Sequence, residues 1–198
     1  MQQRSGLAAV AAALFGLGAG WFYLHAAQPH AAIVMLGNSI TAGTNWNALL
    51  PTFDVANRGV PGDTAEGVLK RLDSIIAMQP QCVAVMLGVN DLQNGRSVQQ
   101  ISENYTAIID RLSASGVTVI VQSKLATSYA RLNASVVDVD RSLGEMCRQS
   151  GRCLYLDLNS TLAPTGVIAD TVDGVHIGPN SYRLWANALT PLLNAHCR

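Results

Sequence analysis

The stretch VMLGNSITAG, residues 34–43, places a short apolar run directly against three small residues, Gly37, Asn38 and Ser39. A continuous apolar run of this length is typical of a strand whose two faces are both covered, as in a parallel sheet. Small polar residues after it favour a turn into a helix. Ser39 therefore stands where a serine either caps the next helix or exposes its hydroxyl at the end of a strand.

Short β-rich runs alternate with longer amphipathic segments along the rest of the chain. The predicted strands are residues 33–36, 53–56, 83–87, 117–122 and 154–157. Apolar residues at helical spacing predict core-facing helices over 68–76 and 98–112, and a last helix opens at Pro179. Asp63, with Glu66 three residues later, predicts a capping box for the first of them. This order predicts an α/β fold, a three-layer α/β/α sandwich around a mainly parallel sheet.

Composition limits the classes of partner and cofactor. The chain has 198 residues, of which 49% are apolar and 13% charged, which suits one domain with a sizeable core. Lys plus Arg equals Asp plus Glu at 13 each, and no basic run supplies a local field, so we expect no nucleic-acid partner. Without a CxxC pair or a His-rich cluster, we also expect no metal and no organic cofactor.

The amino terminus departs from this pattern. After Arg4, residues 7–24 carry no charge, which indicates a membrane-directed segment. Its length and its aromatic end, residues 21–23, suit a membrane anchor, whereas Ala26 and Ala27 give a loose match to the cleavage site of a signal peptide. We expect residues 1–32 to be one or the other, and the domain of residues 33–198 to be exported, whether periplasmic, secreted or anchored in the cytoplasmic membrane facing outward.

Four cysteines form an even count, which permits disulfides in an exported chain. Cys147 and Cys153 flank a short turn and are the easiest pair to close. Cys82 leads an apolar strand, where a bond and a small buried hydrophobic side chain are equally reasonable interpretations.

Polar and small residues follow the predicted strands at the edge where an open α/β sheet binds its ligands. They are Ser39 after the first strand, Gly59 after the second, Asn90 after the third, and Asp173 with His176 before the last helix. Each alone is commonplace, as a helix cap, a turn residue or a structural histidine. Together they supply a hydroxyl nucleophile, a base, a carboxylate and oxyanion donors, which are the parts needed for acyl transfer.

Four short blocks carry a resemblance to a known family. They are GNSIT (37–41), NRGVPGDT (57–64), GVND (88–91) and DGVH (173–176). The chain from residue 33 onward resembles the SGNH (GDSL-type) hydrolases, which are serine esterases and lipases of flavodoxin-like α/β fold. Asn38 departs from the pattern, because the family usually has Asp before the serine.

The resemblance implies a role for each site residue. Ser39 would be the nucleophile, His176 the general base and then acid, and Asp173 the residue that orients the imidazole. The oxyanion would be bound by the backbone N–H groups of Ser39 and Gly59 and by the side-chain amide of Asn90. No metal belongs to this set.

The implied reaction is hydrolysis of a carboxylic acyl ester through an acyl-serine intermediate, on a small-molecule or lipid substrate of the lipase, lysophospholipase or thioesterase kind. Two alternatives stay open: an O-acetyl esterase acting on carbohydrate, and a catalytically silent, membrane-tethered binding domain that kept the fold. We expect the segment 159–172 and the loop 94–97 to form walls of the site, with membrane association through residues 7–24 where they are retained.

Overall fold

The sheet confirms the predicted fold class. The computed structural model of the protein describes residues 32–197. Its sheet has the order β2-β1-β3-β4-β5, and every neighbouring pair is parallel. The strands are β1 (Ile33–Gly37), β2 (Val55–Gly59), β3 (Cys82–Met86), β4 (Thr118–Gln122) and β5 (Leu154–Leu156). The edge strand β2 lies later than predicted, because its second half is polar and hides the strand pattern.

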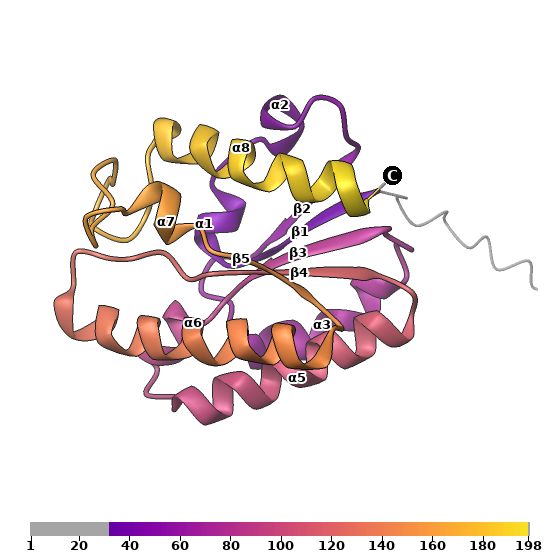
Figure 1. Ribbon diagram of the computed structural model, residues 1–198, viewed down its shortest axis with the longest axis horizontal. Helices are drawn as coiled ribbons and strands as arrows, with labels where there is room; N and C mark the ends of the chain where they lie inside the picture. Colours follow the sequence, from indigo (N-terminus) through magenta and orange to yellow (C-terminus); the bar gives the residue numbers. More distant parts are fainter. Residues whose placement is uncertain (1–31, 198) are drawn as a thin grey trace, which may run out of the picture.

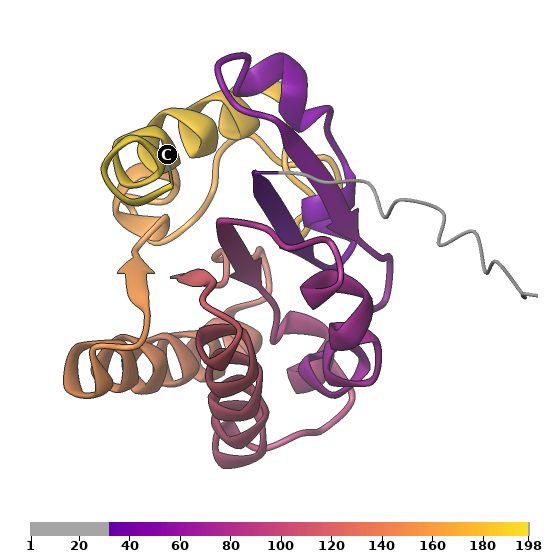
Figure 2. The ribbon, with the colours of Figure 1, turned by 90° about the vertical axis from the view of Figure 1, so that its right-hand side faces the viewer.

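Helices cover both faces of this sheet. They are α1 (Ser39–Ala42), α2 (Trp46–Leu49), α3 (Ala65–Ile76), α4 (Val89–Gln93), α5 (Val98–Ala114), α6 (Ala130–Ser150), α7 (Asn159–Leu162) and α8 (Pro179–His196). Helices α3, α5 and α6 lie below the sheet in Figure 1, and α8 lies above it with α1, α2 and α7. Figure 2 shows the same three layers from the side. The chain is therefore an α/β/α sandwich, as predicted.

The strands are apolar throughout because each face packs against helices. Val34 and Leu36 belong to the core shared with α3 and α5, whereas Ile33 and Met35 belong to the core shared with α8. Successive side chains of a strand point to opposite faces, so a sheet covered twice needs an unbroken apolar run. This packing fixes the strand ends, and with them the residues that follow.

The start of α3 differs from the predicted capping box. Thr64 is the capping residue, and its side chain accepts a hydrogen bond from the backbone N–H of Gly67 at 3.0 Å. Asp63 lies one residue earlier, accepts a hydrogen bond from the Thr64 backbone and pairs with Arg71 at 2.7 Å. Glu66 forms surface ion pairs instead of closing a box. The prediction was wrong because Thr64 is also a residue type that caps helices, and it stands directly before the first helical residue, Ala65.

Helix α6 is absent from the sequence-based expectations, although it is the longest helix among the described residues. Its buried residues are Val136, Val139, Leu143 and Cys147, a narrow stripe at helical spacing. The rest of the helix is polar, because only one side of it touches the core. A stripe this thin gives a weak periodic signal.

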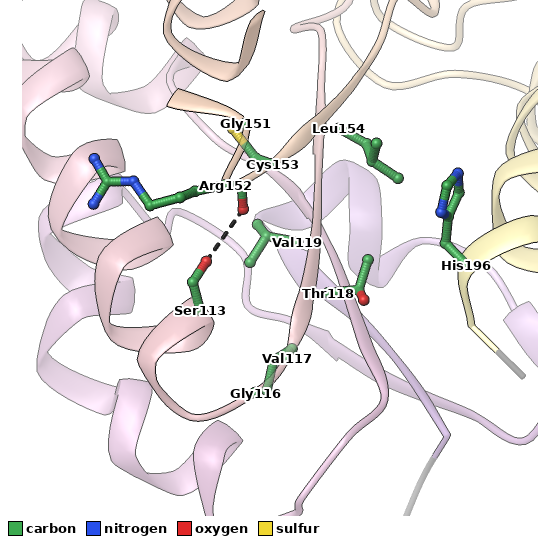
Figure 3. Close-up of a pocket in the computed structure, with 10 residues that line it drawn as sticks. All are labelled: Ser113, Gly116, Val117, Thr118, Val119, Gly151, Arg152, Cys153, Leu154 and His196. Atoms are coloured by element: carbon green, nitrogen blue, oxygen red, sulfur yellow. Dashed lines mark hydrogen bonds between the residues drawn. The ribbon is translucent and has the colours of Figure 1, made fainter. Parts of the chain in front are cut away.

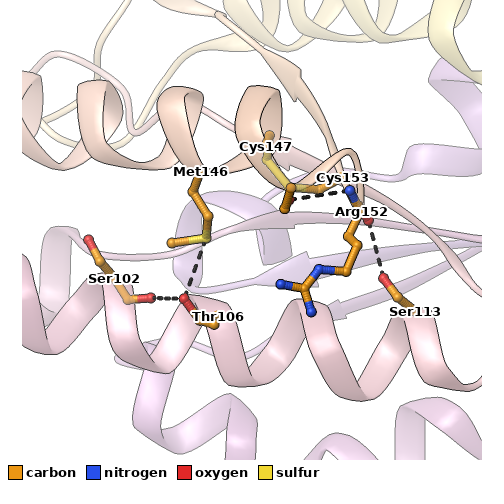
Figure 4. Close-up of a disulfide and its surroundings, with 8 residues drawn as sticks. Ser102, Thr106, Ser113, Met146, Cys147, Arg152 and Cys153 are labelled. Atoms are coloured by element: carbon orange, nitrogen blue, oxygen red, sulfur yellow. Dashed lines mark hydrogen bonds between the residues drawn. A yellow bond between two sulfur atoms is a disulfide. The ribbon is translucent and has the colours of Figure 1, made fainter.

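Two disulfides lie at the amino-terminal edge of the sheet, away from the ends that carry the site. Cys147 and Cys153 join the end of α6 to the start of β5, as predicted (Figure 4). Cys82 is bonded to Cys197, which decides between the two interpretations left open for it and ties β3 to the end of α8. Within residues 32–197 every cysteine is paired.

The predicted amino-terminal segment lies outside the described residues, apart from Ala32. The choice between anchor and signal peptide, with residues 7–24 as the membrane-directed part, stays a prediction. Among the helices of residues 32–197, none combines the length and the apolar character needed to span a bilayer.

Candidate active site

The candidate residues gather where the strand order reverses. In the sheet, β2 lies on one side of β1 and β3 lies on the other. The chain therefore leaves β1 toward β2 and leaves β3 toward β4, in opposite directions. Parallel sheets form a ligand crevice at such a point, outside the carboxyl ends of the strands. Ser39 follows β1 and Asn90 follows β3, which places both at this crevice.

In the turn after β1, one residue caps α1 and the next one carries the hydroxyl of the candidate site. Asn38 is the capping residue of α1: its side-chain oxygen accepts a hydrogen bond from the Ile40 backbone at 3.0 Å, and only 2% of it is exposed. Ser39 is the first residue of the helix, so its hydroxyl is not used as a cap. The Asn38 amide oxygen caps as an aspartate would, without adding a buried charge.

Ser39, His176 and Asp173 form a continuous chain of contacts. The Oγ of Ser39 lies 2.8 Å from Nε2 of His176, although the two residues are 137 positions apart. The other ring nitrogen, Nδ1, lies 2.7 Å from Oδ2 of Asp173. With the ring proton on Nδ1, His176 donates to the carboxylate and Nε2 is left to accept the hydroxyl proton. The structure therefore brings together the three residues proposed from sequence.

The carboxylate of Asp173 stabilises the loop that carries His176 by accepting hydrogen bonds from the loop backbone. Oδ1 of Asp173 accepts hydrogen bonds from the backbone N–H groups of Val175 (3.0 Å) and His176 (2.8 Å), while the Val172 N–H donates to the His176 carbonyl at 2.8 Å. The bond from the His176 ring and these two backbone donors hold the pKa of Asp173 well below its usual range. Asp173 therefore stays ionised wherever a histidine can act as a base.

Asn90 is fixed from the opposite side of the crevice. Its Nδ2 donates to the Asp63 carbonyl at 2.8 Å, which leaves the second amide hydrogen free to meet a ligand. The adjacent Asp91 is 1% exposed and accepts from the Ala65 backbone at 3.0 and 3.2 Å. These bonds join α4 to the start of α3 and set the direction of the Asn90 amide.

A buried cation lies behind α4, and no pattern in the sequence pointed to it. Nζ of Lys124 lies 3.1 Å from Oδ1 of Asp140 and 4.9 Å from the centre of the Tyr105 ring, and the side chain has no exposed surface. Burial lowers the pKa of Lys124 and raises the pKa of both Asp140 and Asp91. From sequence, a lysine just after an apolar strand is expected to be exposed to solvent. Its burial is evident only from the three-dimensional structure.

Lys124 packs directly beneath the residues that precede Asn90. Gly88 has φ +123°, and a Cβ there would lie 2.9 Å from the Lys124 side chain. The Tyr105 hydroxyl accepts from the Leu87 N–H at 2.7 Å and donates to the Leu87 carbonyl at 3.0 Å. The backbone that leads into α4 is therefore fixed by contact with the Lys124 side chain and by the two hydrogen bonds of the Tyr105 hydroxyl.

Gly59 is placed differently from its predicted role. Its backbone N–H donates to Oδ1 of Asn57 at 3.0 Å, and any Cβ at this position would collide with the backbone of Ala42. The glycine is thus required for close packing of β2 on α1. Within the described residues, the N–H of nearby Gly62 has no acceptor.

A cavity of ≈ 570 Å³, called here the cavity beside His176, includes in its lining Val175, the residue before that histidine. Its lining includes the apolar side chains of Leu92, Leu132 and Val175, the ring of Tyr129, and the cations Arg96 and Arg131. Gly95 and Arg96, from the loop 94–97, line this cavity, and the role of that loop as a wall of the site stays a prediction. No residue of the segment 159–172 lines this cavity.

A second cavity, of ≈ 340 Å³, lies at the other edge of the sheet (Figure 3). It contains a serine and a histidine, but the Ser113 hydroxyl donates to the Arg152 carbonyl at 3.2 Å, and His196 stands apart on the far side. Ser113 has no base beside it there. This cavity therefore lacks the arrangement found at Ser39.

Comparison with known proteins finds relatives that are named as a thioesterase and an arylesterase. Thioesterase 1/protease 1/lysophospholipase L1 of Escherichia coli (strain K12) is 31% identical over 112 residues, which cover 50% of this chain and 54% of that protein. An arylesterase of Vibrio mimicus is 28% identical over 122 residues, covering 54% and 61%. The chain thus spans about half, or somewhat more, of the length of these curated relatives.

The fold and the family model extend over more of the chain. A crystal structure of a GDSL-like lipase from Bacteroides thetaiotaomicron covers 82% of this chain and 87% of its own, with a TM-score of 0.72 and 19% identity, which shows a shared fold. The family model described as GDSL-like Lipase/Acylhydrolase matches residues 35–184. That range contains Ser39, Asn90, Asp173 and His176, and the chain belongs to the GDSL-like lipase/acylhydrolase family.

Proposed function

We propose that the protein is a serine esterase that hydrolyses carboxylic acyl esters through an acyl-serine intermediate. The observation that carries this proposal is the chain of contacts from Ser39 through His176 to Asp173, with separations of 2.8 and 2.7 Å. A hydroxyl that is hydrogen-bonded to a base, which a carboxylate orients in turn, is the arrangement that activates serine as a nucleophile.

The reaction would proceed in two halves. Nε2 of His176 takes the proton of Ser39 Oγ as the oxygen attacks the acyl carbon, and the alcohol leaves with that proton. Water then attacks the acyl-serine with the same histidine as base, releasing the acid and restoring the hydroxyl. Asp173 remains ionised, holds the Nδ1 proton and stabilises the imidazolium formed in each half.

The negative charge that develops on the carbonyl oxygen needs donors at the crevice. Two are the Ser39 N–H, at the first position of α1, and the free hydrogen of the Asn90 amide. The third was predicted as the Gly59 N–H, which must first leave Asn57. The N–H of Gly62 is the alternative that the geometry supports, because it has no acceptor within residues 32–197 and precedes Asp63, which holds Asn90.

Export of the protein is proposed with this function. Two disulfides support it, because disulfides persist mainly outside the reducing cytosol. Sequencing the amino terminus of the mature protein tests the segment of residues 1–32. A start near residues 27–33 indicates a cleaved signal peptide and excludes an anchor, whereas an intact terminus excludes cleavage.

Labelling by a serine-reactive phosphonate tests the proposed function directly. The wild-type protein should be labelled once, and Ser39→Ala should not be labelled while it keeps the same melting temperature. Failure of the folded wild type to react, together with no turnover of p-nitrophenyl esters, would favour the silent binding domain. A panel of p-nitrophenyl esters of increasing chain length, run beside an acetylated sugar, then separates a lipase-like esterase from a carbohydrate O-acetyl esterase.

A further inference from the structure

Two lining residues of the cavity beside His176 are close in the chain to site residues, although Ser39, Asn90, Asp173 and His176 are not themselves in its lining. Val175 directly precedes His176 in the chain, and Leu92 is two residues after Asn90 in α4. Leu132 adds a third apolar side chain, and Tyr129, 54% exposed, lies at the cavity with its ring. Apolar walls of this kind take up a hydrocarbon portion of a ligand. This cavity is therefore the one we consider for the part of the substrate remote from Ser39.

The charges around the cavity all have one sign. No Asp or Glu is among its lining residues, whereas Arg96 and Arg131 both line it. Arg96 is partly neutralised, because it pairs with Glu66 at 3.0 Å. The guanidinium of Arg131 has no hydrogen bond or ion pair with any other residue of the described range. The cavity therefore offers one cation without a counter-charge.

Within residues 32–197, four of the nine arginines pair with no carboxylate: Arg58, Arg131, Arg148 and Arg183. Five arginines hold a carboxylate: Arg71, Arg96, Arg111, Arg141 and Arg152. Arg131 differs from the other three arginines without a carboxylate partner in lining the cavity that also includes Val175, the residue before the base His176. A guanidinium binds a carboxylate or a phosphate with two parallel hydrogen bonds, which gives both affinity and direction.

We propose that Arg131 binds a negatively charged group of the substrate, so that the preferred substrates are esters that carry a carboxylate or a phosphate a short hydrocarbon span from the reacting carbonyl. This proposal rests on the esterase function proposed above. Arg131 acts here as a specificity residue, and the apolar side chains of Leu92, Leu132 and Val175 take the span between the two ends.

Matched ester pairs test the proposal and locate the charge. On the acyl side, a p-nitrophenyl monoester of a dicarboxylic acid is compared with the neutral ester of equal length. On the alcohol side, an acyl ester of 4-hydroxybenzoate is compared with that of its methyl ester, and an acyl ester of a hydroxyalkyl phosphate tests phosphate. The measured quantity is the ratio of kcat/KM for the charged ester to that for its neutral partner.

We expect the wild type to favour the charged member of at least one pair about tenfold, which is the size of one charge-assisted hydrogen bond. Arg131→Gln should remove this preference, Arg131→Lys should keep part of it, and added salt should weaken it. Arg148→Gln is the matched control, because Arg148 is an exposed arginine of the same helix that lines a different cavity. A wild-type ratio near or below one in every pair, or an equal ratio in Arg131→Gln, would overturn the proposal.

Binding to Ser39→Ala separates this proposal from the esterase function. Titration of that variant with the charged and neutral esters needs no turnover. Tighter binding of the charged ester, lost in Ser39→Ala with Arg131→Gln, supports the role of Arg131 even if the wild type hydrolyses none of the esters. Equal binding of both esters contradicts it, whatever the phosphonate labelling shows.

Discussion

The two halves of the candidate site are built in opposite ways. The nucleophile half rests on the core: Asn38 is 2% exposed, Asp91 is 1% exposed, and Lys124, which packs against Gly88 before α4, is fully buried. The histidine half is a loop at the surface, where the side chains of His176 and Asp173 are 43% and 54% exposed. One half is held by the packing of the sheet and the other by a few hydrogen bonds within the loop.

This difference separates stability from activity. Changes in the nucleophile half disturb buried charges and backbone bonds, so they should lower the free energy of unfolding. Changes in the histidine loop remove exposed contacts, so they should lower activity while the fold persists. The following variants test that division, from the largest expected effect to the smallest.

Asp173→Asn should lower kcat by roughly 10⁴, because an amide leaves the imidazole without the carboxylate that fixes its tautomer. The melting temperature should stay close to that of the wild type, since the carboxylate is more than half exposed. Steady-state kinetics on a p-nitrophenyl ester and a thermal melt measure both. A variant that melts much earlier would show that the loop supports the fold after all.

Lys124→Met should destabilise the protein by about 3–5 kcal/mol, because Asp140 and Asp91 then lose their buried cation. Denaturant unfolding measures the change. Lys124→Met with Asp140→Asn should recover part of the loss, since one of the two uncompensated carboxylates is then neutral. If the single variant is as stable as the wild type, the nucleophile half does not depend on this charge cluster.

Asn90→Ala should lower kcat by roughly 10² to 10³, the usual effect of removing one oxyanion donor. Its bond to the Asp63 carbonyl is also lost, at a cost of about 1 kcal/mol in unfolding free energy. Kinetics and denaturant unfolding on the same sample separate these effects. Turnover near the wild-type rate would remove Asn90 from the mechanism.

Asn38→Ala should lower the free energy of unfolding by about 1 kcal/mol, since α1 loses its side-chain cap. Asn38→Asp keeps an acceptor in the same place and serves as the comparison. The two variants are compared by denaturant unfolding. Equal losses in both would show that the amide of Asn38, rather than its role as acceptor, is what the site requires.

Protonation of Asp173 should disturb the histidine loop only at a pH below the usual pKa of an aspartate. Because the pKa of Asp173 is lowered in the folded protein, its contribution to stability is complete above the usual pKa of an aspartate and is lost only as the pH falls through the lowered value. The acid limb of kcat/KM should therefore not report Asp173. Carbon-detected NMR titration of its carboxylate measures this, and a midpoint at or above the usual pKa of an aspartate, about 3.9, would contradict it.

The sequence alone predicts the part of the site that lies in local motifs. Ser39, Asn90, Asp173 and His176 each follow a recognisable strand or turn, and the structure brings them to one crevice. The burial of Lys124 could not be predicted from sequence, because it depends on contacts with Gly88, Tyr105 and Asp140, which are distant in the chain.

Two further details depend on contacts that a sequence does not display. The bond between the Gly59 N–H and Asn57 changes which donor is free at the crevice. Helix α6 has so thin an apolar stripe that its length is evident only from the fold. Local propensity thus predicts the strand ends, whereas close packing decides how each residue there is used.

The bond between Cys82 and Cys197 also determines what happens if the chain is cut. The surface segment after α7 carries Val167 and Val172, which are 50% and 78% exposed, and a protease would reach it first. A cut there leaves Ser39 on one fragment and His176 on the other, but the disulfide spans the break and keeps the two fragments in one molecule. The nicked protein should run as one band on a gel until it is reduced, with both parts of its site still covalently linked.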